Sequence, residues 1–290
     1  MQHFDDIKDN EIRMLGYDDE RPTRRGRWFW YAVGCLIIFA VVLVLVLNLL
    51  SKDEEAKQPL VEDEVIETID PSVAADFLSN TDDRFGAVTL VDDTVVDGIN
   101  LLLLKPVNAT PELHLGPLDT TDRSVVFAAL AADIRRDNGG IVGAYVLKGN
   151  PLAWGLSKKG YVAIIHGKTA IGVADNSPYF EMATETEGYF FRQYPAVKNH
   201  QAVENRPENK SQRKAVCSLD GEIVVIATND RVLMNDFSAA LAHLGVNNAV
   251  FLIGSNAYCH YVDQQGVKHL LGDDLLESVK NINYILWRRK

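Results

Sequence analysis

The chain has 290 residues, 47% of them hydrophobic and 24% charged, which is the composition of a globular protein. Its formal net charge of −11 argues against nucleic acid as a partner, because proteins that bind nucleic acids present basic surfaces. The cysteines and histidines lack the spacing of zinc ligands, and no phosphate loop or dinucleotide fingerprint is present, so we expect no metal and no cofactor.

An uninterrupted apolar stretch at residues 28–50 predicts one transmembrane helix, because no charged residue lies between Arg27 and Lys52. A helix of this length spans a hydrocarbon core of roughly 30 Å. Arginines crowd its N-terminal edge and acidic residues follow its exit, which favours a cytoplasmic N-terminus. The alternative is a cleaved signal peptide, but its apolar region is shorter and ends at a small-residue site. The pattern favours an uncleaved signal anchor.

The regions around this helix divide the chain into further parts. Residues 1–27 read as a cytoplasmic tail, and residues 51–75 as an acidic linker that cannot bury enough apolar surface to fold. Residues 76–290 are long enough for one domain with its own core. We expect this domain to lie outside the cytoplasm, in the periplasm or its equivalent.

The first half of the domain shows alternating strand and helix signals. We predict two hairpins, one around Asp92-Asp93-Thr94 and one around His166-Gly167-Lys168. Between them the pattern predicts a helix over residues 121–137, stopped by Asn138-Gly139-Gly140, and a strand over 141–148. A short helix over 177–186 follows and ends at Gly188.

The second half contains the clearest local signals. Asp220-Gly221 predicts a hairpin between strands at 214–219 and 222–228, because this dipeptide suits a tight turn. Asn235 is expected to cap a helix that Gly245 ends. Strands are predicted over residues 246–253, 258–262 and 283–287. The expected fold class is α+β, with a mainly antiparallel mixed sheet and a few covering helices.

Two cysteines lie in the predicted domain, at Cys217 and Cys259. Outside the cytoplasm they are able to form one disulfide; the alternative is a pair of buried thiols. The sequence leaves both open. His260, next to Cys259, is expected to be a packed or edge histidine.

The run of residues 213–226, followed by 236–246 and 248–252, resembles the C-terminal half of the phosphodiester glycosidase family, the family of the lysosomal uncovering enzyme. Residues 193–199 and 141–168 are similar to earlier segments of that family, so the resemblance covers about residues 95–290. The version of the motif in this chain, Gly254-Ser255-Asn256-Ala257, is similar to that of Bacteroides-type bacterial members.

The resemblance implies hydrolysis of a sugar 1-phosphodiester, so the implied partner is a carbohydrate phosphodiester. Arg213 matches the family's arginine, and its guanidinium suits a bidentate phosphate contact. The turn at Gly254, Ser255 and Asn256 replaces the family's Asp-Gly-Gly-Gly-Ser, where backbone N–H groups are suited to an anion. Ile253 stands where the family has its acidic residue, so the alternative is a glycan-binding domain without catalysis.

Several other residues carry chemistry suited to a sugar phosphate. Asp133 and Arg136 are three apart and share a face of the predicted helix. Trp154 beside polar side chains is a platform for a sugar ring. Paired carboxylates on the short helix are candidate general acids of a glycosidase. The complete set of candidates is Arg213, Glu181 and Glu185 for catalysis and Gly254, Ser255, Asn256, Trp154, Ser157, Lys159, Gln193, Asp133 and Arg136 for substrate binding. The default alternative for the charged groups is a solvated surface.

Overall fold

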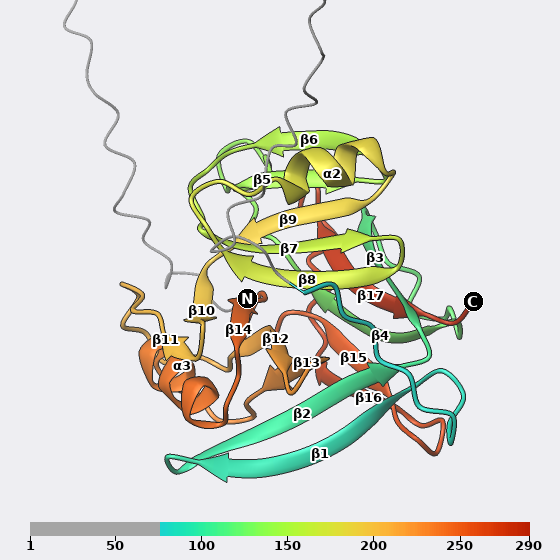
Figure 1. The fold of residues 1–290 in the computed structure, drawn as a ribbon, viewed down its shortest axis with the longest axis vertical. Coiled ribbons are helices and arrows are strands. Elements are labelled where there is room, and N and C mark those ends of the chain that lie inside the picture. The colour runs from blue at the N-terminus through green and yellow to red at the C-terminus, as the bar shows by residue number, and fades with distance from the viewer. Residues whose placement is uncertain (1–75) are drawn as a thin grey trace, which may run out of the picture. The chain divides into compact units, whose positions relative to one another are not determined.

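The computed structural model describes residues 76–290, whose strands form three antiparallel sheets accompanied by two helices (Figure 1). These residues belong to one compact unit. The described part of the chain contains no helix long and apolar enough to cross a membrane. The predicted tail, transmembrane helix and acidic linker lie outside the described residues.

The largest sheet has seven strands in the order β1-β2-β13-β12-β14-β10-β11. Its bounds are β1 Val88–Val96, β2 Ile99–Val107, β13 Glu222–Ala227, β12 Lys214–Leu219, β14 Asn248–Phe251, β10 Pro195–Lys198 and β11 Gln201–Ala202. Helix α3, Met234–His243, packs Phe237, Ala240 and Leu241 against one face of this sheet. The other face points into the centre of the domain.

The second sheet has five strands in the order β16-β15-β4-β17-β3. Its bounds are β16 Lys268–Gly272, β15 Cys259–Val262, β4 Val125–Leu130, β17 Asn283–Arg288 and β3 Thr110–Leu115. Every residue of β4 is buried, because neighbouring strands flank it on both sides and side chains cover both of its faces.

The third sheet has the order β6-β5-β9-β7-β8. Its bounds are β6 Asn150–Trp154, β5 Ala144–Leu147, β9 Tyr189–Gln193, β7 Gly160–Ile165 and β8 Lys168–Val173. Helix α2, Tyr179–Glu185, covers the outer face of this sheet, where Tyr179 and Ala183 pack with Tyr161 and Phe190. Strand β6 lies at one edge of the sheet.

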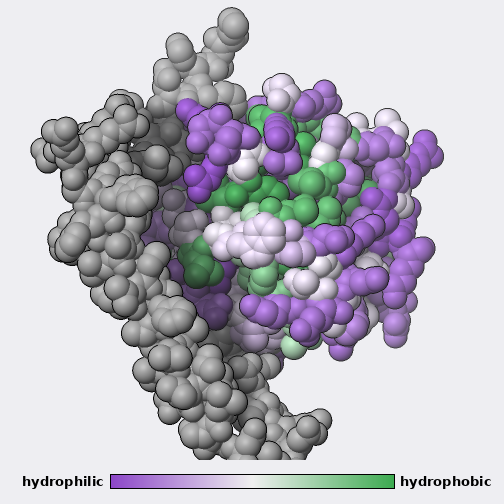
Figure 2. All heavy atoms as spheres, turned by 90° about the horizontal axis from the view of Figure 1, so that it is seen from above, coloured by the Kyte–Doolittle hydropathy of each residue, from purple (hydrophilic) through white to green (hydrophobic). Residues whose placement is uncertain are grey.

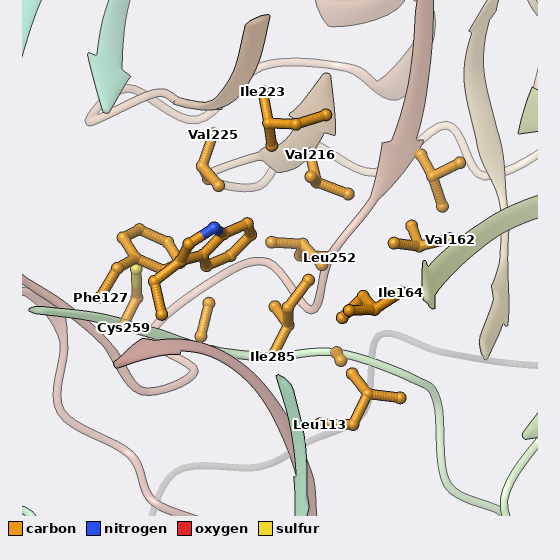
Figure 3. Packing of buried hydrophobic residues seen from close by; sticks show 14 of the residues in the cluster. Leu113, Phe127, Val162, Ile164, Val216, Ile223, Val225, Leu252, Cys259 and Ile285 are labelled. Atoms are coloured by element: carbon orange, nitrogen blue, oxygen red, sulfur yellow. The ribbon is translucent and has the colours of Figure 1, made fainter. Parts of the chain in front are cut away.

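One core joins the three sheets, as Figure 3 shows. Val216 and Val225 enter it from the first sheet, Phe127 and Ile285 from the second, and Val162 from the third. A fully buried aliphatic or aromatic side chain of this kind contributes about 1.5–3 kcal/mol relative to exposure. The core therefore fixes where the strand ends meet, and those ends position the candidate site.

Many predicted elements are present. The structure has hairpins at His166-Gly167 and Asp220-Gly221, the short helix α2, and helix α3, which is followed by Gly245 at φ +99°. The sheets and helices of the described residues agree with the predicted α+β class.

Three local predictions were wrong. Residues 121–137 contain strand β4 and loops, not a helix, because burial on both faces gives the strand a continuous apolar run without alternation. The first hairpin turns at Asp97-Gly98 rather than at Asp92-Asp93-Thr94. Leu233, not Asn235, is the N-cap of α3, and the Asn235 side chain instead accepts a hydrogen bond from the Asn205 N–H.

The two cysteines are buried free thiols. Cys217 lies on the α3 side of the first sheet, whereas Cys259 lies in the central core. The sheet therefore separates them, and the second of the two alternatives, a pair of buried thiols, holds.

Candidate functional site

Four strand ends meet at one place in the domain. The N–H of Ile253, just after β14, donates to the Leu130 carbonyl at the end of β4 (3.1 Å). The N–H of Phe251 donates to the carbonyl of Tyr194, which separates β9 from β10 (2.9 Å). The N–H of Leu252 donates to the Lys214 carbonyl at the start of β12 (2.8 Å). Side chains that follow these strand ends are thereby brought together.

The centre of this place is the ammonium group of Lys158. It donates to a carboxylate oxygen of Asp133 at 2.5 Å and to the side-chain oxygen of Gln193 at 3.1 Å. It also lies 3.2 Å from the centre of the Tyr194 ring, a cation–π contact. Each of the three N–H donors of the ammonium thus has an acceptor. This explains how the positive charge can be buried, although the Lys158 side chain is only 6% exposed. We call Asp133, Lys158, Gln193 and Tyr194 the Lys158 cluster.

Within the Lys158 cluster, Asp133 is the charged group that reaches solvent. Its side chain is 36% exposed, whereas Gln193 is buried. The buried ammonium holds the Asp133 carboxylate in one orientation. A carboxylate that is held in this way and is partly exposed to solvent is suited to accept or return a proton.

Arg192 fixes the backbone of Lys158 from the other side of the third sheet. Its guanidinium donates to the carbonyl groups of Lys158 (2.8 Å), Ala174 (2.9 Å) and Asp175 (3.2 Å). The residue is 2% exposed, and burial lowers the pKa of its guanidinium. Because these three carbonyls belong to two loops, Arg192 holds the loop that carries Lys158 against its neighbour.

The turn after β14 is held by Lys214, not by Arg213. The buried ammonium of Lys214 donates to the carbonyls of Ser255 (3.0 Å) and Ala257 (3.2 Å). Burial lowers the pKa of this ammonium. Lys214 therefore uses its positive charge to organise the backbone of the turn.

The turn itself is closely packed. The Ser255 N–H donates to the Gln212 carbonyl at 2.9 Å, and a Cβ on Gly254 would lie 2.5 Å from the same carbonyl oxygen. The Asn256 side chain donates to Asp273 at 2.6 Å. Ser255 and Asn256 are exposed, so their side chains face solvent while the Ser255 N–H is already bonded within the protein.

Arg213 directs its guanidinium away from this turn. It donates to the backbone carbonyls of Asn209 and, at 3.2 Å, of Val232, and it is 8% exposed. Burial lowers its pKa to about 10. A phosphate contact by Arg213 stays a prediction, and this geometry does not favour it because backbone groups already occupy the guanidinium.

Trp154, Ser157 and Lys159 lie on the exposed loop side of the third sheet. Trp154, at the end of edge strand β6, is 65% exposed and Ser157 is also exposed. Lys159 forms a surface ion pair with Asp175 at 2.7 Å. Figure 2 views the molecule from the side of β6 and α2 and shows hydrophobic residues gathered among hydrophilic ones.

Glu181 and Glu185 are exposed on α2, which covers the outer face of the third sheet. Gln193 belongs to the Lys158 cluster at the end of β9, and its side chain lies on the inner side, with that of Phe191. The two glutamates are therefore separated from Gln193 by the sheet. Asp133 and Arg136 do not share a helix face, since this segment is a loop, and Asp133 pairs with Lys158. Arg136 is exposed in that loop.

Sequence reasoning singled out Asp133 and Gln193 of the Lys158 cluster, but not Lys158, Tyr194, Lys214 or Arg192. Each of these four residues is the direct neighbour of a residue that was singled out. Strand alternation was the available signal, because the side chains of adjacent strand residues point to opposite faces. Among residues 76–290, no group of three or more His, Cys, Asp or Glu side chains is arranged to hold a metal ion.

Comparison with known proteins adds a likeness of fold. No family model and no curated protein matches the chain. The catalytic domain of zebrafish N-acetylglucosamine-1-phosphodiester alpha-N-acetylglucosaminidase, in a form auto-inhibited by its pro-peptide, is similar with a TM-score of 0.50 at 12% identity, over 73% of this chain and 87% of that one. A hypothetical protein from Synechocystis has a TM-score of 0.47 at 12% identity, over 70% of this chain and 62% of that one. The described domain thus has a fold distantly related to that of a phosphodiester glycosidase catalytic domain.

Proposed function

We propose that the chain is a phosphodiester glycosidase of the cell envelope, which hydrolyses a sugar 1-phosphodiester. The observation that carries this proposal is the part-exposed carboxylate of Asp133, held by a buried ammonium where the strand ends of this fold meet. The sequence resemblance over residues 95–290 and the likeness to the zebrafish catalytic domain support the same class of reaction.

In the proposed reaction, water adds across the bond between the anomeric carbon and its phosphate oxygen. The oxygen of water joins the sugar, and the leaving group is a phosphate monoester that keeps the bridging oxygen. Asp133 accepts the proton that water loses, and the nearby Lys158 holds its carboxylate in position for this role. Asp133 thereby supplies the carboxylate that the family resemblance would place at Ile253.

The remaining candidates have supporting roles in this proposal. Trp154 packs its exposed ring against the substrate, and Ser157 and Lys159 bind the polar groups of the substrate. The exposed side chains of Ser255 and Asn256 border the same strand ends. Contributions from Arg213, Arg136, Glu181 and Glu185 stay predictions, since the contacts described above do not bring these side chains into the Lys158 cluster.

Binding of a glycan without catalysis is the second candidate function. Ile253 favours it, because an apolar side chain packed against the cluster of Val125 and Tyr258 replaces the acidic residue of the family. Under this alternative the exposed Trp154 binds a sugar and Asp133 has only a structural role.

Turnover of an N-acetylglucosamine 1-phosphodiester by the purified full chain separates the two functions. We expect Asp133→Asn to lower kcat by about 100-fold or more, the usual contribution of a general base, and the exposed Asp93→Asn to leave it unchanged. Saturable binding with no turnover by the unaltered chain would instead establish the second candidate.

The proposed location follows from the predicted signal anchor at residues 28–50, with the domain outside the cytoplasm. Protease added to intact spheroplasts should digest residues 76–290 if this orientation is correct. Digestion only after the membrane is opened would instead place residues 76–290 in the cytoplasm.

A further inference from the structure

Three exposed apolar side chains follow one another at alternate positions beside the candidate site. Leu152, Trp154 and Leu156 are 42%, 65% and 64% exposed. Leu152 and Trp154 belong to edge strand β6, and Leu156 continues the chain beyond it. We call these three residues the apolar stripe. An exposed apolar patch rimmed by polar residues is typical of a binding surface.

A sugar ring accounts for only part of the apolar stripe. Sugars stack on aromatic rings such as Trp154, but the two leucines on either side of it offer neither an aromatic face nor a hydrogen bond. An aliphatic chain, in contrast, gains from contact with leucine and tryptophan alike, because all three remove apolar surface from water.

The stripe leads directly to a cation that is able to exchange partners. Lys159, three residues after Leu156, is 62% exposed and pairs with Asp175, whose side chain is 82% exposed. An ion pair this exposed contributes little, so a phosphate is able to replace Asp175 at small cost. The preceding residue is Lys158, which holds Asp133. A single segment therefore carries an apolar surface, the lysine that holds the Asp133 carboxylate and a replaceable ion pair.

We propose that the substrate carries an aliphatic chain, which lies along Leu152, Trp154 and Leu156 while its phosphate pairs with Lys159. This inference rests on the proposed function and narrows its substrates to amphipathic sugar phosphodiesters. In these compounds the second ester of the phosphate is formed with an aliphatic alcohol. The aliphatic chain of the substrate binds the apolar stripe, its phosphate takes the place of Asp175 beside Lys159, and its sugar reaches Asp133.

Two measurements on the full chain in phosphatidylcholine nanodiscs test this inference. The first compares turnover of N-acetylglucosamine 1-phosphodiesters made with methanol and with hexanol. The second compares binding of methyl phosphate and hexyl phosphate by calorimetry, with empty nanodiscs as the blank. We expect about tenfold higher kcat/KM for the hexyl phosphodiester and about tenfold tighter binding of hexyl phosphate. The reason is that five additional methylene groups are partly buried on an open surface.

The variant Leu152→Ser/Leu156→Ser should abolish the preference for hexyl compounds and leave methyl phosphate binding unchanged. The matched control is Val267→Ser/Leu270→Ser, which removes apolar side chains of similar exposure, 52% and 57%, near and on β16. This control should keep the preference. Lys159→Gln should weaken binding of both phosphates, whereas Lys168→Gln, at the exposed start of β8, should not.

The outcomes separate this inference from the proposed function. Turnover of both phosphodiesters without a hexyl preference would overturn the inference and leave the function standing. A hexyl preference in binding without any turnover would support the apolar stripe and overturn the function. Loss of self-association, or of attachment of the domain to the bilayer, in the stripe variant with an unchanged hexyl preference would assign the stripe to a second copy or to the membrane surface and overturn the inference.

Discussion

Arg213 and Lys214 are neighbours at the start of β12, and their side chains leave opposite faces of the seven-stranded sheet. Arg213 donates to carbonyls of Asn209 and Val232 on the α3 side, whereas Lys214 donates to carbonyls of Ser255 and Ala257 on the side of the central core. The family resemblance drew attention to Arg213, yet Lys214 is the cation that contacts the turn after β14.

Arg213→Met should therefore lower the stability of the domain. The substitution leaves two backbone carbonyls without their charged donor, and we expect the free energy of unfolding to fall by about 1–3 kcal/mol. Urea unfolding followed by circular dichroism measures this. Arg231→Met is the control, because exposed Arg231 also donates to a carbonyl but remains in contact with water. Unchanged stability together with weaker phosphate binding would instead show that Arg213 is a substrate ligand.

Gly254→Ala should also destabilise the domain, for a steric reason. The added Cβ would lie 2.5 Å from the Gln212 carbonyl oxygen, which also accepts the Ser255 N–H, so the backbone of the turn has to move. We expect a loss of about 1–3 kcal/mol, as for other overpacked sites.

The control for this substitution is Gly86→Ala, since no atom lies within 4 Å of the corresponding Cβ. Thermal unfolding of both variants provides the comparison. Equal melting temperatures for the two would mean that the turn accommodates a side chain and that its glycine is not required for packing.

Local turn chemistry explains which parts of this fold were predictable. His166-Gly167 and Asp220-Gly221 specify hairpins through residues that adopt positive φ, so both were found from the sequence. Strand β4 was missed because its six residues are all buried, which leaves no period-two alternation to distinguish it from a helix.

The candidate site was less predictable because its contacts join distant segments. Lys158 and Asp133 are 25 positions apart, and Lys214 and Ser255 are 41 positions apart. Composition and spacing identify Asp133 as a polar residue, but only the sheet arrangement brings Lys158 to it. The same arrangement places Glu181 and Glu185 on the opposite side of the third sheet from Gln193, although the three residues are close in sequence.

The two cysteines of the domain should resist alkylation in the folded protein. Burial raises the pKa of the Cys259 thiol to about 12 and raises that of Cys217 as well, so neither forms the reactive thiolate at neutral pH. In a Cys35→Ser background, N-ethylmaleimide should modify both residues only after urea is added. Mass spectrometry of the peptides reads the result, and a Cys217–Cys259 linked peptide without reductant would contradict the fold.

His260 should make the domain less stable as the pH falls from neutral towards 4. The imidazole is 2% exposed, and its Nδ1 has no hydrogen-bond partner. Burial lowers its pKa to about 4, assisted by the charge of Lys268 and opposed by a hydrogen bond with the backbone of Val125. The Tyr258 ring, 5.5 Å away, contributes no negative charge, since burial raises its own pKa to about 12.

The sign of the effect follows from proton binding. In the unfolded chain His260 takes up a proton near its ordinary pKa of 6.5, whereas in the folded domain it does so only near 4. Between these values the unfolded state binds more protons, so stability is complete above pH 6.5 and falls as the pH approaches 4, by about 3 kcal/mol from this group. Urea unfolding from pH 7.5 to 4 measures the decline, and His260→Phe should remove this part of it. His166→Asn, at an exposed turn, should retain it; a decline of equal size in the His260→Phe protein would assign the acid sensitivity to other groups.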